Sequence, residues 1–221
     1  MPGKVFFSVS MSLDGYTAPE SMDGIFATPE QLEQNPLLSR GVNQWMELQS
    51  WIFPQRFFQK SLGLGEGGEE GLDNDIATRT FERTGASIMG KNMFDLGEGS
   101  WPEEAPFHTP VFVLTHQQRD PWKRPGDTTF HFVNDGIHSA LDQARDAAGN
   151  RDVRIAGGSE TILQYLNAGL IDEFSIALSP VLFGAGTRLF DGIDAAKIAL
   201  EPIRSEPSPR VTHLTYAVRP R

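Results

Sequence analysis

The sequence predicts an α/β fold in which helices cover a largely parallel sheet and antiparallel strands follow at the C-terminal end. Short apolar runs of strand length recur along most of the chain. From residue 130 to residue 156 a strand, a helix and a strand succeed one another, as in a β-α-β unit. Beyond Asp172 the strand patterns are separated only by turns, which indicates antiparallel pairing.

The length and composition fit one compact domain over residues 1–221. Apolar residues make up 39% of the chain and charged residues 22%, an ordinary globular mixture. The 22 glycines and 15 prolines indicate many turns. A chain of 221 residues is long for one domain but within the range of single α/β domains.

Charge and composition exclude several classes of function. The net charge of −10 repels nucleic-acid phosphates, so nucleic acid is not an expected partner. No run approaches ~20 apolar residues and no signal peptide is visible, so we expect a cytoplasmic protein without a membrane span. The chain has no cysteine, and its five histidines lack the spacing of metal ligands, so no metal site is expected.

The first strand is predicted over residues 4–10, where Val5, Phe7 and Val9 alternate with other residues. An irregular excursion from the sheet follows at about residues 17–73, with one helix expected around residues 43–51. Its glycine-rich segment, residues 63–71, is expected to be a mobile loop because nothing in it can be buried.

After the excursion, a helix is predicted from Asp73, which can cap it, to Arg83. Gly85 is expected to end this helix. The later expected elements are a strand at 86–89, a short helix to residue 96, strands at 111–115 and 130–133, a helix at 136–148, a strand at 153–156, a helix at 159–167, and strands at 173–179, 196–202 and 211–218.

Two glycines mark the turn between the strand at 153–156 and the following helix. Gly157, Gly158, Ser159, Glu160 and Thr161 occupy this turn. A helix N-terminus exposes unpaired N–H groups, and glycines let a phosphate approach the backbone closely. The alternative is that the glycines only form the turn and that Ser159 only caps the helix.

A second turn of this kind follows the strand at 86–89. Gly90 ends the strand, and Lys91, Asn92 and Met93 open a short helix. A lysine in the first turn opposes the helix dipole unless an anion lies between them. The alternative is a simple exposed cation.

Two further strand ends carry polar groups. Thr115 ends the strand at 111–115 and His116 follows it, and Asp14 follows the first strand in an Asp-Gly turn. Because ligands of parallel sheets bind at the carboxyl ends of the strands, all four turns are expected at one ligand edge.

These stretches, in this order, resemble the dihydrofolate reductase-like superfamily. The similarity is to the branch that holds the reductase domain of the riboflavin-biosynthesis deaminase-reductase and its stand-alone relatives. The motifs are S-L-D-G, I-M-G-K-N-M-F, V-F-V-L-T-H, A-G-G-S-E-T-I, G-L-I-D-E and S-P-V-L-F-G-A-G-T-R-L-F, spread over about residues 4–218.

The resemblance implies a three-layer αβα fold with a mixed, mostly parallel central sheet and antiparallel C-terminal strands. It implies an NADPH-dependent reductase, usually a homodimer, that transfers a hydride to a C=N or C=C bond of a small substrate, possibly a pterin- or pyrimidine-like heterocycle. The residues it assigns to the cofactor are Leu13 and Gly15 beside the nicotinamide, Gly90, Lys91, Asn92 and Met93 at the phosphates, Thr115 and His116 near the adenosine ribose, and Gly157, Gly158, Ser159, Glu160 and Thr161 at the pyrophosphate.

The chain departs from the family pattern at two points that bear on the substrate. Ala156 stands where the riboflavin-pathway reductase typically has glutamate. The pterin-binding carboxylate of folate enzymes would fall in the excursion, where Glu47 is the candidate. Asp14 is the candidate proton donor, directly or through water, on the condition that burial beside the cofactor raises its pKa. A nucleotide-binding sensor or scaffold without turnover is the alternative function.

Overall fold

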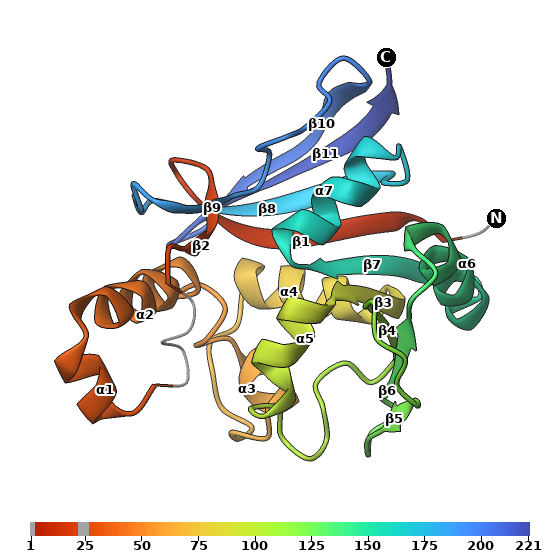
Figure 1. The fold of residues 1–221 in the computed structure, drawn as a ribbon. Helices are drawn as coiled ribbons and strands as arrows, with labels where there is room; N and C mark the ends of the chain where they lie inside the picture. Colours follow the sequence, from red (N-terminus) through yellow and green to blue (C-terminus); the bar gives the residue numbers. More distant parts are fainter. Residues whose placement is uncertain (1–2, 22–26) are drawn as a thin grey trace.

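The computed structural model describes residues 3–21 and 27–221, and within them nine strands form one sheet (Figure 1). The strand order is β10-β11-β8-β1-β7-β3-β4-β6-β5. The strands of this sheet are β1 (Val5–Ser12), β3 (Thr84–Gly90), β4 (Pro110–Leu114), β5 (Trp122–Lys123), β6 (Thr129–Val133), β7 (Asp152–Gly157), β8 (Glu173–Ser179), β10 (Ile198–Pro207) and β11 (Thr212–Pro220). Strands β2 (Tyr16–Pro19) and β9 (Gly186–Arg188) form a separate two-stranded ribbon.

The centre of the sheet is parallel, as the sequence predicts. Strands β8, β1, β7, β3, β4 and β6 all pair in parallel, and β11 and β10 add antiparallel strands at one edge. One expectation is wrong here. The strand at 173–179 belongs to the parallel part, because it lies directly beside β1, and the antiparallel region begins only with β11.

Helices cover both faces of the sheet, which makes the fold three-layered. The helices are α1 (Pro29–Gln34), α2 (Pro36–Leu48), α3 (Arg56–Ser61), α4 (Leu72–Glu82), α5 (Lys91–Glu98), α6 (Ile137–Ala148) and α7 (Ser159–Asn167). Helices α6 and α7 pack on the larger core, which includes Phe7, Ile88 and Ile155. Helix α5 packs on the other face through Phe94, against Met89 and Val113. This arrangement confirms the predicted fold class.

The excursion is more ordered than the sequence indicates. It contains β2 and three helices, and α2 ends at Leu48, three residues before the predicted end at residue 51. The glycine-rich segment is also anchored at its end. Glu69 pairs with Arg210, Glu70 pairs with Arg56, and Gly68 packs so closely on the Arg56 backbone that a Cβ there would lie 2.6 Å from it.

The expected boundaries of α4 are wrong for a physical reason. Gly71 is the N-cap, and Asp73 lies inside the first turn, where its buried carboxylate contacts His213 Nε2 at 2.7 Å. The Asp73 side chain therefore contacts His213 and does not cap the backbone of the helix. Gly85 lies inside β3, where a Cβ would overlap Ala148 of α6 at 2.8 Å. The glycine therefore serves helix-sheet packing and does not end the helix.

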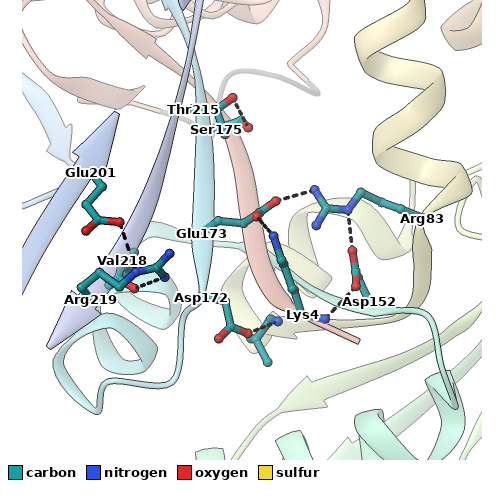
Figure 2. A network of polar contacts seen from close by, with 11 residues as sticks. Lys4, Arg83, Asp152, Asp172, Glu173, Ser175, Glu201, Thr215, Val218 and Arg219 are labelled. Carbon is teal, nitrogen blue, oxygen red and sulfur yellow. Dashed lines mark hydrogen bonds and ion pairs between the residues drawn. The ribbon is translucent and has the colours of Figure 1, made fainter. Parts of the chain in front are cut away.

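A network of charged side chains holds the amino ends of the central strands together (Figure 2). Arg83, between α4 and β3, donates to Asp152 at 2.5 Å and to Glu173 at 2.7 Å, and its guanidinium lies 4.1 Å from the centre of the Phe6 ring. Lys4 also pairs with Glu173. Burial alone would raise the pKa of Glu173, but the hydrogen bonds from Lys4 and Arg83 outweigh burial and hold that pKa below its ordinary value.

Replacing Arg83 by methionine is expected to lower the free energy of unfolding by about 1–3 kcal/mol at neutral pH, because two carboxylates lose their partner. A carboxyl group with a depressed folded-state pKa stabilises the fold above its unfolded pKa, and that contribution disappears as pH falls through the folded value. The difference between the two proteins should therefore shrink as pH falls below the ordinary value of 4.5 for glutamate. Urea unfolding at neutral and acidic pH measures it.

The control is Arg79→Met, which removes an exposed arginine from the same helix. An equal loss of stability in both variants, or a difference that does not depend on pH, would contradict the role of the network.

Candidate functional site

The four predicted turns lie at one edge of the sheet. Strands β1, β7, β3 and β4 are consecutive in the sheet and parallel, so their carboxyl ends meet there. Met89 is level with Gly157, and Gly90 is level with Leu114. The sequence therefore correctly predicted that separate turns converge on one edge.

The turns after β3 and β7 interlock because they lack side chains at the contact. A Cβ on Gly90 would lie 2.5 Å from Thr161 Oγ1, and a Cβ on Gly157 would lie 3.1 Å from Met93 Sδ. Gly157 has a φ of +132°, which L side chains rarely adopt, and its peptide bond to Gly158 is cis. The start of α7 is thus pressed against the end of β3, and the start of α5 against the end of β7.

The two helix starts present free backbone donors to the edge. Gly90 is the N-cap of α5 and Gly158 the N-cap of α7, and neither cap residue has a side chain to accept from the first-turn N–H groups. The space beside Gly158 is open, since nothing lies within 4 Å of a Cβ placed there. Two adjacent helix N-termini with open backbone are suited to binding phosphate groups.

Charged side chains at these helix starts have opposite signs. Lys91 in the first turn of α5 forms an ion pair with Asp95 one turn later. Asn92 beside it is exposed. Glu160 adds an exposed carboxylate to the first turn of α7. Among these side chains, Lys91 is the one able to pair with an anion.

The third turn, after β4, is polar and open. The Thr115 backbone N–H donates to Val133, and its hydroxyl accepts from the Gln117 N–H at 3.1 Å. His116 is exposed. Arg119 beyond them stacks on Phe132 at 4.6 Å and donates to Glu98 at 2.6 Å, so its guanidinium is held against α5.

The fourth turn is organised by the Asp14 carboxylate. It accepts from Ser12 Oγ at 2.7 Å and from the backbone N–H groups of Phe183 and Gly184 at 3.1 and 2.8 Å. Partial burial would raise the pKa of Asp14, but these hydrogen bonds outweigh burial and lower it. The hydrogen bonds of the chain itself therefore favour the ionised carboxylate, whereas a proton donor requires that burial beside the cofactor raises this pKa.

A short ribbon ties the fourth turn to the start of α7. Thr17 Oγ1 of β2 lies 2.6 Å from Ser159 Oγ, and Arg188 of β9 donates to the Asp14 carbonyl at 2.9 Å. Leu13 is 61% exposed at the tip of the turn, and Gly15 has a φ of +89°. The turn after β1 is thereby fixed beside Gly158.

Glu47, the predicted substrate carboxylate, is exposed on α2, while the next residue, Leu48, is fully buried. The side chain that connects the end of α2 to the sheet is that of Gln49, whose Oε1 accepts from Ser10 Oγ at 2.8 Å. Trp51 Nε1 donates to the same hydroxyl at 2.9 Å. The structure therefore places a neutral amide, and not Glu47, against β1.

The contact of Ser10 with Gln49 is not predicted by the sequence. A signal for part of this group was present, because serines alternate at Ser8, Ser10 and Ser12 and mark one polar face of the first strand. No sequence pattern connects that face with Gln49, since 39 positions separate the two bonded residues.

No group of three or more potential metal ligands lies together anywhere in residues 3–21 and 27–221. Within the same ranges, every helix is too short or too polar to span a bilayer.

Comparison with solved structures defines the class of fold. A putative riboflavin biosynthesis protein from Shewanella sp. PV-4 superimposes with a TM-score of 0.61 and 22% identity, over 98% of this chain and 99% of that one. Dihydrofolate reductase from Enterococcus faecalis, complexed with NADP(H), superimposes with a TM-score of 0.54 and 14% identity, over 99% and 98%. The fold is thus dihydrofolate reductase-like.

The sequence assigns the family more narrowly. Residues 3–214 match the family model described as the RibD C-terminal domain, and the chain belongs to that family. An uncharacterized protein of Bacillus subtilis (strain 168), YyaP, is 26% identical over 126 residues, which cover 54% of this chain and 66% of YyaP. The resemblance drawn from the sequence motifs is confirmed.

Replacing Gly90 by alanine is expected to destabilise the protein by about 1–3 kcal/mol, because the added methyl group would overlap Thr161 Oγ1. The φ of Gly90 is −80°, an ordinary value for alanine, so the cost should come from packing and not from the backbone. Urea unfolding measures the change.

The matched background is Thr161→Ala, since Thr161 Cβ would lie 3.8 Å from the added methyl, at ordinary contact distance. In the Thr161→Ala background, most of the destabilisation caused by Gly90→Ala should disappear. A Gly90→Ala cost of the same size in both backgrounds would refute the interlocked packing of the two turns.

Proposed function

We propose that the protein is an NADPH-dependent reductase that transfers a hydride to a C=N or C=C bond of a small, pterin- or pyrimidine-like heterocycle. The observation that carries this proposal is the pair of interlocked, uncapped helix N-termini at the carboxyl edge, in a chain of the RibD C-terminal domain family. Residues 1–221 would act as one domain, because β1 and β11 belong to the same sheet.

The residues at this edge fit a dinucleotide. Gly90 and Gly157 lack side chains where a Cβ would fill the space between the turns, and Gly158 faces open space. In our proposal Gly157, Gly158, Ser159, Glu160 and Thr161 hold the pyrophosphate, and Gly90, Lys91, Asn92 and Met93 hold the adjacent phosphates. Thr115 and His116 would lie beside the adenosine ribose, and Leu13 and Gly15 beside the nicotinamide, which supplies the hydride when bound.

Asp14 has a positioning role in this proposal. Its carboxylate holds the backbone of Phe183 and Gly184 and orients the β1 turn, and its lowered pKa keeps it ionised at neutral pH. The side chains that line the face of β1 nearby, Ser10 and Gln49, are neutral. The substrate would be recognised there by hydrogen bonds from hydroxyl and amide groups, and not by a pterin-binding carboxylate.

A ligand sensor without turnover is the second candidate. The lowered pKa of Asp14 favours this candidate, because a binding protein needs the phosphate-binding turns but no proton donor. Oxidation of NADPH by candidate heterocyclic acceptors separates the two functions: turnover supports the reductase, and tight binding without turnover over a broad acceptor set supports the sensor.

Gly158→Ala is expected to weaken NADPH binding by at least about tenfold, because the methyl group would occupy the space where a phosphate approaches the α7 backbone. The φ of Gly158 is −71° and the space is open, so the ligand-free stability should change little. Thermal unfolding with NADPH measures binding, since a ligand at ~100 times its dissociation constant adds ~2.7 kcal/mol to stability.

Gly99→Ala, at the far end of α5 with a φ of −85° and open surroundings, is the matched control. The cofactor assignment fails if folded native protein shows no shift with NADPH. The placement of the pyrophosphate fails if both alanine variants bind NADPH equally well.

We also propose a homodimer, formed through the edge strand β10. Among residues 3–21 and 27–221, this ten-residue strand has no partner strand on its outer side, and it carries the exposed Leu200 and Ile203. A long edge strand with exposed apolar residues is a template for pairing with another chain, and a second copy presents the same edge.

Ile203→Glu is therefore expected to convert a dimer into a monomer, because the new charge would lie in the interface. Leu64→Glu alters a more exposed leucine in the glycine-rich segment and should leave the assembly unchanged. Light scattering gives the mass of each protein, and a native monomer would rule out the dimer.

A further inference from the structure

Gln49, the residue at which α2 ends, carries an amide group of which only the oxygen is used within the chain. Its Oε1 atom accepts from the Ser10 hydroxyl at 2.8 Å. Its Nε2 atom has no hydrogen-bond partner in residues 3–21 and 27–221, and it is not enclosed, because the side chain is half-exposed. Gln49 therefore presents free N–H donors on a side chain that is anchored through its oxygen.

Ser10 determines which way round the Gln49 amide lies. The serine oxygen accepts from the Trp51 indole N–H at 2.9 Å, a group that can only donate. The serine is buried, so its own proton needs an acceptor, and within the described residues the acceptor it contacts is Gln49 Oε1. A reversed amide would direct its NH2 group at Ser10 as well and would leave the serine proton unpaired. The NH2 group therefore lies on the free side of the amide.

The fold holds both neighbours of this amide in place. Trp51 is buried, and its ring meets the His213 ring edge-on with the ring centres 5.0 Å apart. The backbone directly before Gln49 is fixed as well, because Ser179 Oγ donates to the Leu48 carbonyl at 3.1 Å. The free N–H donors thus have a fixed direction, which lowers the entropic cost of binding a ligand to them.

Gln49 lies at the carboxyl edge of the sheet, near the turn proposed for the nicotinamide. Its partner Ser10 is two residues before Ser12 on the same face of β1, which corresponds to about 7 Å along the strand. Ser12 is the last residue of β1 and donates to the Asp14 carboxylate of that turn at 2.7 Å. The Leu48 carbonyl is bonded to the last residue of β8, which is level with Ser12. The end of α2 is therefore attached to the ends of both strands.

Strand β1 is separate from β7 at the level of Ser10. The two strands pair only at Val5 and Phe6 of β1. Beyond Phe6, β1 follows β8 to its last residue, while β7 follows β3 as far as Gly157. Within the described chain, Ser10 thus belongs to the part of β1 that pairs on one side alone. Because ligands of parallel sheets bind at the carboxyl ends of the strands, we expect the substrate beside this part of β1.

We propose that Gln49 is a specificity-determining residue of the substrate site. Its amide donates a hydrogen bond to an acceptor atom of the substrate, a carbonyl oxygen or a ring nitrogen, and Ser10, with Trp51 behind it, fixes that direction. This inference rests on the proposed reductase function, because it assigns the hydrogen-bonding class of the substrate of the same site. A substrate that offers an amino group there would place two donors against each other and leave both unpaired.

The test compares two pteridines that offer opposite groups at two ring positions. Pteridine-2,4-dione carries carbonyl oxygens where 2,4-diaminopteridine carries amino groups. Each is titrated calorimetrically into protein saturated with NADPH, and the ratio of the two dissociation constants is the readout. The main variant is Gln49→Glu. The matched control is Gln143→Glu, which alters an exposed glutamine of α6 whose Nε2 donates to Ser139 Oγ at 3.1 Å.

Native protein and Gln143→Glu are expected to bind the dione at least about tenfold more tightly than the diamine, because the dione pairs with the free amide and the diamine does not. Gln49→Glu should reverse this preference, since Ser10 still donates to one carboxylate oxygen and the other oxygen replaces the NH2 group. A native preference for the diamine, native binding of neither pteridine, or an unchanged preference in Gln49→Glu would overturn the assignment.

A second variant, Ser10→Ala, separates the fixing of direction from simple structural support. Without the hydroxyl the Gln49 amide can lie either way, so the ratio of the two dissociation constants should fall to within about threefold. Equal losses of affinity for both pteridines, with the ratio unchanged, would exclude the role of Ser10, and Gln49→Glu alone decides the case if Ser10→Ala does not fold. If native protein fails to bind NADPH, the proposed function is refuted, while the ratio measured without NADPH still decides the role of Gln49.

Discussion

The close contact between the turn after β3 and the turn after β7 is the constraint on which the candidate site depends. Gly90 has no side chain where Thr161 Oγ1 approaches it, and Gly157 has none where Met93 lies. Parallel pairing of β3 with β7 sets the level of both turns. The contact brings the N-termini of α5 and α7 close together, so that two helices present backbone donors at one edge of the sheet.

The opposite end of the sheet supplies the rigidity that this contact needs. Arg83 connects the start of β3 with Asp152 of β7 and Glu173 of β8, and it does so with paired charges rather than apolar packing. Such pairs specify which strands lie side by side, since a shift of register would separate each charge from its partner. The amino edge thus fixes strand order, and at the carboxyl edge Gly90 and Gly158 carry no side chain at the two helix starts.

The sequence was sufficient for the parts of the fold that follow from local pattern. Alternation and helical spacing predicted the strands around β1, β3, β4 and β7 and the helix α7, and the four turns predicted the edge. It was insufficient where residues far apart in the sequence determine the local structure. Asp73 has the side chain of a helix cap, yet its buried contact with His213, 140 positions away, places it inside α4. The positions of Gly85 and Gln49 likewise depend on distant contacts, with Ala148 and with Ser10 respectively.

The alternation of serines along β1 shows how one strand can serve two purposes. Val5, Phe7, Val9 and Met11 face the large core under α6 and α7. The other face carries Ser8, Ser10 and Ser12, of which Ser10 bonds Gln49 and Trp51, and Ser12 bonds Asp14. One face of β1 thus supplies the core, and the other supplies the polar contacts that fix the turn after the strand and the end of α2.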